Sequence, residues 1–190
     1  MKLHSVTMNQ FPRCTRFIQV ELCLERLRQR KKVWDAFLNA CTVIDWDGTT
    51  VTRFTPPAGI GIDRFAKQAV TWQDGPMVSV MPGLVKVPLG GDACGSFDTN
   101  MSGDTLLTIS DIVMRFYEKR WADPLSSEML ETTLLHECVH WAWFRAGIDG
   151  VVPTFPGYSP MEIGNAFEVW AYGTQRCTKP NVEIAQSRAR

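Results

Sequence analysis

The chain has no long apolar run and no net charge, and each absence excludes a class of protein. No stretch approaches the roughly 18 apolar residues of a membrane helix, and the first residues, Met1 to Ser5, are not followed by the apolar segment of a signal peptide. Its 20 basic and 20 acidic residues balance, which argues against bulk attraction to nucleic acid or an anionic membrane. We therefore expect no nucleic-acid partner, no membrane span, and either a cytoplasmic location or export by a dedicated secretion system.

Cysteine is present but is not arranged in a recognisable pattern. The six cysteines are scattered without any C-x-x-C spacing, so neither a cysteine zinc site nor a compact disulfide framework is predicted. Whether any two of them form a disulfide is not decided by the sequence. Because 190 residues can bury a sizeable core and no linker or repeat interrupts them, a single domain spanning residues 1–190 is expected.

Histidine is rare, and two of the three histidines stand four positions apart in His136-Glu137-Cys138-Val139-His140. Residues four apart on a helix share one face, so both imidazoles can reach one metal ion. Glu137 lies beside that face, where it can take a proton from a water at the metal. This H-E-x-x-H pattern is typical of a zinc hydrolase. The alternative, two structural histidines, would leave three polar side chains without partners on an otherwise apolar helix.

Hydrophobic spacing and end signals predict an α+β fold. The serine and aspartate at 110 and 123 precede two helices as N-caps, and glycines 147 and 173 end two. The helices are expected over residues 15–40, 62–72, 112–121, 124–146 and 161–172. The strands are expected in a hairpin over 43–54 and over 77–81, 84–87 and 106–109, with a loop over 90–104 and a polar, loosely held tail after Pro180.

A catalytic zinc ion usually has three protein ligands, so a third is expected downstream of His140. Glu168 is the first candidate, because small residues on its face of the 161–172 helix would let that helix approach the motif helix closely. Glu162 is the second candidate, since a carboxylate in the first helical turn is also favoured by the helix dipole. Asp149, in the intervening loop, is the third.

With Glu168 as a ligand, residues 104–173 resemble the gluzincin class of zinc metallopeptidases. In more detail they are similar to the small H-E-x-x-H toxin peptidases of bacteria, including domains delivered by type VI secretion. Residues 1–100 carry no motif of that class. The resemblance implies a zincin-like fold, in which a small mixed sheet lies beside an active-site helix and a second helix carries the glutamate ligand.

The resemblance also implies roles for individual residues. His136, His140 and Glu168 would bind Zn²⁺, and Glu137 would be the general base of a zinc metalloendopeptidase. Tyr172, with Tyr158 as the other candidate, would support the oxyanion.

The resemblance extends to partners. The strand over 106–109 would hold a protein or peptide substrate in extended form, and an inhibitory immunity protein is an expected further partner. Two other functions stay open, a non-catalytic binding protein stabilised by zinc and a housekeeping intracellular peptidase. Glu137 favours catalysis over the first, because a structural zinc site has no use for a base.

Overall fold

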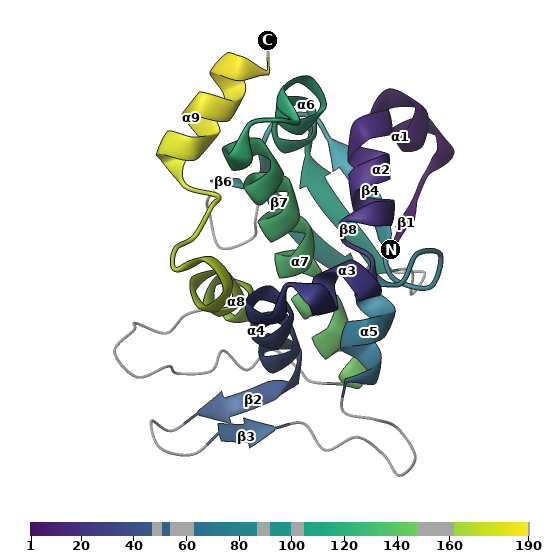
Figure 1. Ribbon diagram of the computed structural model, residues 1–190, viewed down its shortest axis with the longest axis vertical. Helices are drawn as coiled ribbons and strands as arrows, with labels where there is room; N and C mark the ends of the chain where they lie inside the picture. The colour runs from purple at the N-terminus through teal and green to yellow at the C-terminus, as the bar shows by residue number, and fades with distance from the viewer. Residues whose placement is uncertain (47–50, 54–62, 87–91, 100–104, 148–161, 190) are drawn as a thin grey trace.

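The computed structural model describes residues 1–46, 51–53, 63–86, 92–99, 105–147 and 162–189 (Figure 1). Helices and a small mixed sheet confirm the predicted α+β class. The helices are α1 Ser5–Gln10, α2 Pro12–Val20, α3 Leu24–Gln29, α4 Lys31–Thr42, α5 Arg64–Val70, α6 Asp111–Arg120, α7 Pro124–Ala146, α8 Ile163–Tyr172 and α9 Lys179–Arg188. The strands are β1 Lys2–Leu3, β2 Val43–Trp46, β3 Val51–Arg53, β4 Met77–Met81, β5 Val85–Lys86, β6 Asp92–Ala93, β7 Gly95–Thr99 and β8 Thr105–Ser110.

The main sheet has four strands in the order β1-β4-β8-β7. β1, β4 and β8 run parallel, whereas β7 runs antiparallel to β8 at the edge. Two sequence predictions are therefore wrong. The segment 90–104 was expected to be a loop but contains β6 and β7, and the 106–109 strand expected to hold substrate is inside β8, paired on both sides. β7 was missed because its largely polar sequence gives no strand pattern. The segment is a strand because its backbone pairs with β8, as Ser96 pairs with Thr108.

The motif helix α7 crosses one face of the sheet and packs against β7 and β8 (Figure 1). Most of its apolar side chains are buried, and Leu130, Leu134 and Val139 are fully so. Asp123 caps its first turn by accepting from Leu125 N, and Gly147 ends it, as predicted. α8 packs against both α7 and α4, so its residues approach the H-E-x-x-H stretch from the side.

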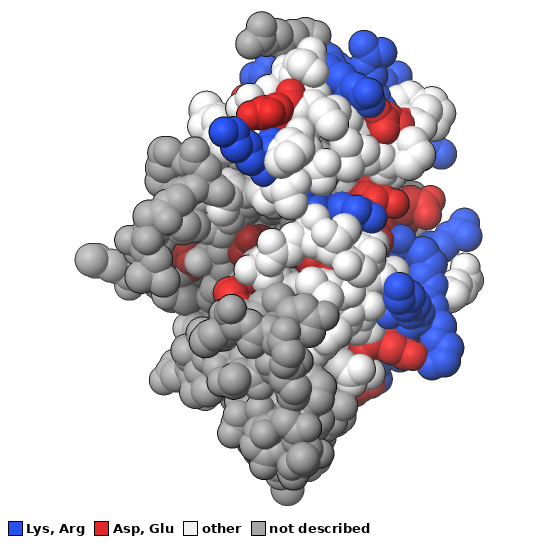
Figure 2. Space-filling model, turned by 90° about the vertical axis from the view of Figure 1, so that its left-hand side faces the viewer, with Lys and Arg blue, Asp and Glu red and all other residues white. Residues whose placement is uncertain are grey.

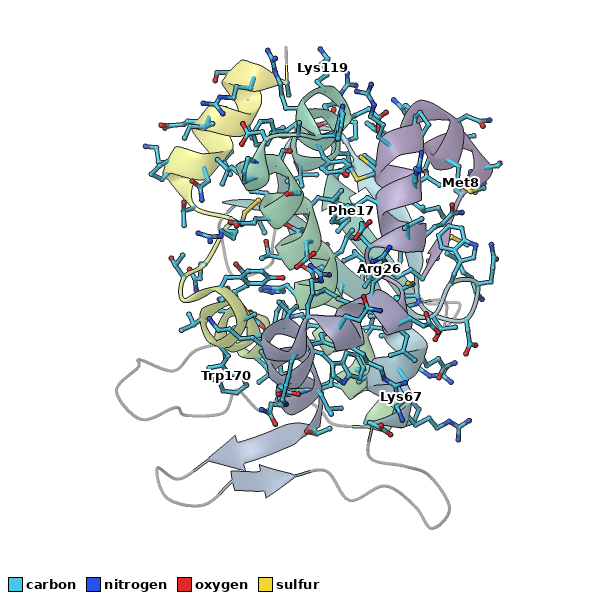
Figure 3. The ribbon with its side chains drawn as sticks, viewed as in Figure 1. Met8, Phe17, Arg26, Lys67, Lys119 and Trp170 are labelled. Carbon is cyan, nitrogen blue, oxygen red and sulfur yellow. A yellow bond between two sulfur atoms is a disulfide. The ribbon has the colours of Figure 1, made fainter. Side chains whose placement is uncertain are left out.

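The N-terminal helical region differs from the single helix expected over residues 15–40. Three helices, α2, α3 and α4, occupy this span, with breaks at residues 21–23 and at Arg30. Arg30 leaves helical geometry with φ −91° and ψ 68°, and its guanidinium pairs with the buried Glu131 of α7 at 2.5 Å. The tertiary contact thus outweighs the continuous helical spacing. In α2, Phe17 lies 4.9 Å from the Tyr117 ring of α6, ring centre to ring centre (Figure 3).

The C-terminal residues form a helix rather than the loosely held tail that was expected. α9 packs on α6, buries Val182 and Ala185, and its Arg188 pairs with Asp123 at the start of α7. One cluster of buried apolar side chains extends from Met1 to Ala185 in α9. The single-domain assignment stays a prediction. Among the described residues, no helix combines the length and apolar character needed to cross a bilayer.

Candidate metal centre

The two histidines of the motif stand one turn apart on α7, as predicted. Their ring centres are 5.3 Å apart. The His136 and His140 side chains are 17% and 27% exposed, so both reach the surface of an otherwise buried helix. Glu137 is only 5% exposed. Its carboxylate packs against β7, since a Cβ at Gly95 would lie 2.9 Å from Glu137 Oε1. The motif therefore faces the edge strand.

Glu162 completes a three-residue cluster with the histidines. Its Oε2 lies 3.1 Å from His136 Nε2, and its Oε1 lies 2.6 Å from His140 Nε2. Glu162 is the N-cap of α8, where its carboxylate accepts from Gly164 N at 2.5 Å and from Asn165 N at 3.0 Å. The helix start thus fixes the carboxylate in place.

Gly164 allows α8 to come this close to α7. A Cβ at this position would lie 2.4 Å from both Nε2 and Cδ2 of His136, far below an ordinary van der Waals contact. The sequence prediction that a small residue in this helix permits close approach is therefore consistent with the packing, and the atom approached is a ring nitrogen of His136.

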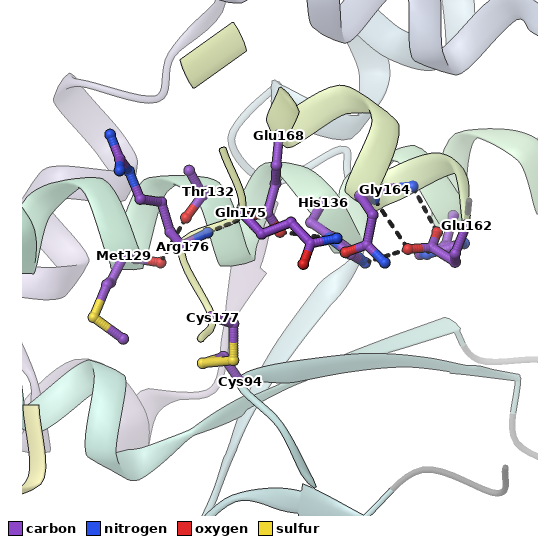
Figure 4. Close-up of polar contacts among 12 residues, drawn as sticks. Cys94, Met129, Thr132, His136, Glu162, Gly164, Glu168, Gln175, Arg176 and Cys177 are labelled. Atoms are coloured by element: carbon purple, nitrogen blue, oxygen red, sulfur yellow. Dashed lines mark hydrogen bonds and ion pairs between the residues drawn. A yellow bond between two sulfur atoms is a disulfide. The ribbon is translucent and has the colours of Figure 1, made fainter. Parts of the chain in front are cut away.

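Glu168 contacts the opposite nitrogen of His136. Its Oε1 lies 2.9 Å from Nδ1, and its Oε2 accepts from Arg176 N at 2.6 Å (Figure 4). The carboxylate is 3% exposed and lies behind the ring, away from His140. This geometry differs from the expectation that Glu168 is the third ligand, because Nε2, the nitrogen that faces His140 across the cluster, meets Glu162 instead. A carboxylate on the far nitrogen orients a ligating imidazole.

The donor set fits a divalent metal ion. Two imidazole nitrogens and one carboxylate oxygen, from His136, His140 and Glu162, lie within 4.8 Å of one another. Two nitrogens and one oxygen are the ligands that catalytic zinc sites use, with a further position left for water or substrate. Among the described residues, this is the one group of three such side chains that can hold an ion.

A pocket of about 630 Å³ opens over the cluster. Its described walls are Ala93, Cys94, Gly95, Ser96, Phe97, Thr133, His136, Glu137, His140, Glu162, Asn165, Glu168, Gln175 and Cys177. They come from β7 and the residue pair before it, from α7, from α8, and from the segment after α8. On the face shown in Figure 2, several acidic side chains lie near the middle, and others lie among the lysines and arginines at the top and the right-hand edge.

The charges and the burial at the cluster shift the pKa values of His136, Glu162 and Glu137. Burial alone would lower the pKa of His136, but Glu162, Glu137 and Glu168 outweigh it and raise that pKa well above its ordinary value. For Glu162 burial alone would raise the pKa, but the neighbouring His136 and His140 outweigh burial and lower it. Burial raises the pKa of Glu137, and the two histidines offset this only in part. In the metal-free site, a proton on His136 therefore competes with a metal ion for this nitrogen ligand.

Tyr172 lies away from this pocket. Its hydroxyl donates to Glu131, which also pairs with Arg30, and Tyr172 is not among the described pocket walls. Burial, followed by the Glu131 charge, raises the pKa of Tyr172. The geometry therefore gives no support to the oxyanion role expected of it. The other candidates, Tyr158 and Asp149, lie outside the described residues.

The sequence left open whether two cysteines pair, and the structure joins Cys94 to Cys177, which are 83 positions apart and both line the pocket. Nothing in their spacing indicates the pairing. The sequence analysis also did not identify Asn165 and Gln175 as pocket residues, because neither belongs to a recognisable sequence motif. The sequence places Glu162 in the first turn of the expected 161–172 helix, whereas the structure makes it the N-cap, one residue before α8 begins.

Comparison with protein families identifies the chain. The family model described as metallopeptidase toxin 3 matches residues 7–173. The chain belongs to the metallopeptidase toxin 3 family. The resemblance to toxin-type metallopeptidases is thereby confirmed, and the α+β arrangement agrees with the zincin-like fold expected of them. Membership in the metallopeptidase toxin 3 family makes the protein a metal-dependent peptidase with a toxin role. No curated protein and no solved structure matches the chain significantly.

Proposed function

We propose that the chain is a zinc-dependent endopeptidase toxin whose metal ligands are His136, His140 and Glu162. The observation that carries this proposal is the Glu162 carboxylate, which faces Nε2 of both histidines. Glu168 then takes the orienting position on His136 Nδ1. A carboxylate there fixes the imidazole tautomer and strengthens the donor nitrogen on the other side of the ring.

Zn²⁺ bound by these side chains supplies a Lewis acid that polarises water and a peptide carbonyl. Glu137, buried in the pocket wall, accepts a proton from the attacking water and returns it to the leaving amine. Its raised pKa suits both steps, because a carboxylate that holds a proton more readily is a better base and can release the proton again. The Glu137 side chain packs against Gly95, where a Cβ would lie 2.9 Å from its Oε1, so this packing limits its movement in the pocket wall.

The substrate strand in this proposal is β7. Within the described sheet, β7 is an edge strand that pairs only with β8, and its Ser96 and Phe97 line the pocket. An extended peptide can add to such an edge by backbone hydrogen bonds. The amides of Asn165 and Gln175 are the described side chains placed to donate to the substrate carbonyl, in the role expected of Tyr172.

A toxin peptidase acts on a protein of its target, and a producing cell would need an inhibitory immunity protein. We extend the proposal to delivery by a dedicated secretion system such as type VI. The Cys94–Cys177 disulfide supports an oxidising destination, since such bonds persist outside the reducing cytosol. A non-catalytic zinc protein is less well supported, because the pocket lies directly over the cluster and includes Glu137.

The test compares two alanine variants with the wild type for zinc content, zinc affinity and cleavage of an unfolded protein. Glu162→Ala removes a ligand and should abolish stoichiometric zinc and cleavage. Glu168→Ala should keep zinc but bind it about 10–100-fold more weakly, as is typical when the partner of a metal-bound histidine is lost. Full zinc affinity in Glu162→Ala, together with zinc loss in Glu168→Ala, would restore Glu168 as the third ligand. A zinc-loaded wild type that cleaves nothing would refute the peptidase mechanism.

A further inference from the structure

The segment Gln175–Cys177, here called the strap, joins α8 to α9 and touches the site at three consecutive residues. Gln175 lines the pocket, Arg176 N donates to Glu168 Oε2 at 2.6 Å, and Cys177 is bonded to Cys94 (Figure 4). These contacts reach Glu168 in α8 and Cys94, the residue directly before β7. The strap therefore borders the pocket on the side of the metal cluster away from Glu162.

The contacts form an unbroken chain from the disulfide to a metal ligand. Cys177 fixes the neighbouring Arg176, whose amide holds one oxygen of Glu168, while the other oxygen holds His136 Nδ1 at 2.9 Å. Glu168 is 3% exposed, so a displaced strap would leave a buried carboxylate oxygen without its amide donor. Such a group is costly to leave unsatisfied, and the carboxylate would turn away from His136 to find another partner.

The other end of the disulfide lies beside the base. Cys94 directly precedes Gly95, against which the Glu137 carboxylate packs. One covalent bond thus ties the segment that positions His136 to the strand that borders Glu137. The two sides of the pocket come from residues 83 positions apart in the chain, and the disulfide links them directly.

We propose that the Cys94–Cys177 disulfide positions the metal ligand His136, acting through the Arg176 amide and Glu168. This rests on the proposed role of His136 as a metal ligand. Cys94 and Cys177 are positioning residues and do not touch substrate. The site reaches its full metal affinity only after the two thiols have been oxidised.

Oxidation proceeds by exchange with a disulfide-bonded partner, a protein or a small molecule. The two thiols become one disulfide, and the partner's disulfide takes up the two electrons and two protons as two thiols. In a reducing compartment the exchange runs the other way. The peptidase therefore binds its metal weakly under reducing conditions, where the two cysteines are thiols. It reaches full metal affinity under oxidising conditions, where the disulfide has formed.

The test is a double-mutant cycle on zinc affinity, measured by chelator competition on the full chain. One arm is the Cys94→Ser, Cys177→Ser variant, the second is Glu168→Ala, and the third combines them. The disulfide variant should bind zinc about 10–100-fold more weakly. The loss of zinc affinity caused by removing the disulfide should be several-fold smaller when Glu168 is already alanine, because both changes act on the same imidazole. If the disulfide acted only through overall stability, the losses of zinc affinity in the disulfide variant and in Glu168→Ala would add independently in the combined variant.

Two controls separate positioning from stability. Cys23→Ser removes a thiol outside the pocket walls and should leave zinc affinity unchanged. Tyr172→Phe removes the α8 bond to Glu131 and should lower the melting temperature without altering zinc affinity. The visible spectrum of bound Co²⁺ should change in the disulfide variant and stay as in the wild type in both controls, because only the former alters the His136 contact.

Wild-type protein reduced with a phosphine gives the same comparison without mutation, should the serine variant not fold. Wild-type zinc affinity after loss of the disulfide, or fully additive losses in the cycle, would overturn the inference. A cycle that behaves as expected in a protein without peptidase activity would instead refute only the proposed function. The affinity measurement requires no cleavage, so the two failures are distinguishable.

Discussion

Gly164→Ala tests whether the close approach of α8 builds the metal centre. The added Cβ would lie 2.4 Å from His136 Nε2, about 1 Å closer than an ordinary contact, so the helix start or the ring must move by a similar amount. Glu162 is two residues away and sits 2.6 Å from His140 Nε2. Because metal–ligand distances tolerate only about 0.2 Å, we expect zinc affinity to fall on the order of 10–100-fold.

The stability change in this variant is smaller than the change in function. Alanine is favoured over glycine in a helix by about 1 kcal/mol, whereas overpacking a close contact costs about 1–3 kcal/mol. The two nearly offset, so the melting temperature should fall by only a few degrees. Chelator competition and cleavage of an unfolded protein measure the functional loss in the same sample.

A second glycine provides the control. At Gly83 a Cβ would meet nothing within 4 Å, but φ is +76°, so Gly83→Ala should cost about 1–2 kcal/mol through backbone strain. Gly83 does not line the metal pocket, so zinc affinity should stay as in the wild type. Gly164→Ala with unchanged zinc affinity and cleavage would refute the argument that α8 must lie against His136.

Three further outcomes are expected. Glu137→Gln should retain zinc and fold but lose cleavage by about 10²–10⁴-fold or more, because the amide cannot accept a proton; normal cleavage with normal zinc would remove Glu137 from the mechanism. Tyr172→Phe should lower the free energy of unfolding by about 1.5–3 kcal/mol through its lost bond to Glu131 and leave the cleavage rate unchanged; a large rate loss would return Tyr172 to the oxyanion role. Zinc affinity should rise with pH beyond the range of an ordinary histidine, because the raised pKa of His136 in the metal-free site lets protons compete there; chelator competition that gives the same affinity across neutral pH would contradict this.

The elements that the sequence predicted well are those with local signals. Ser110 and Asp123 act as N-caps, and Gly147 and Gly173 end α7 and α8. A cap acts within one turn of the helix, so its residues are close in sequence and readable there. The H-E-x-x-H pairing is local in the same way, since its two imidazoles share a face whatever the rest of the chain does.

The elements that were missed depend on partners far away in the chain. The expected 15–40 helix is broken where Arg30 reaches Glu131, 101 positions later. Apolar spacing continues across that break, because Leu27 and Trp34 are still buried in separate helices. β7 similarly needs β8, and its polar residues give it no strand pattern of its own. In each case a nonlocal contact overrode the local pattern.

Glu162, the N-cap of α8, and Glu168, within α8, show why a ligand set is harder to predict than a motif. The sequence places Glu162 and Glu168 near the histidines but cannot tell which imidazole nitrogen each would meet. That choice depends on how α8 lies against α7, which Gly164 permits, and on the strap, whose Arg176 amide holds the Glu168 carboxylate behind the ring. The assignment of a ligand and of its orienting partner is therefore a property of packing, and mutations in the strap should alter it without touching either glutamate.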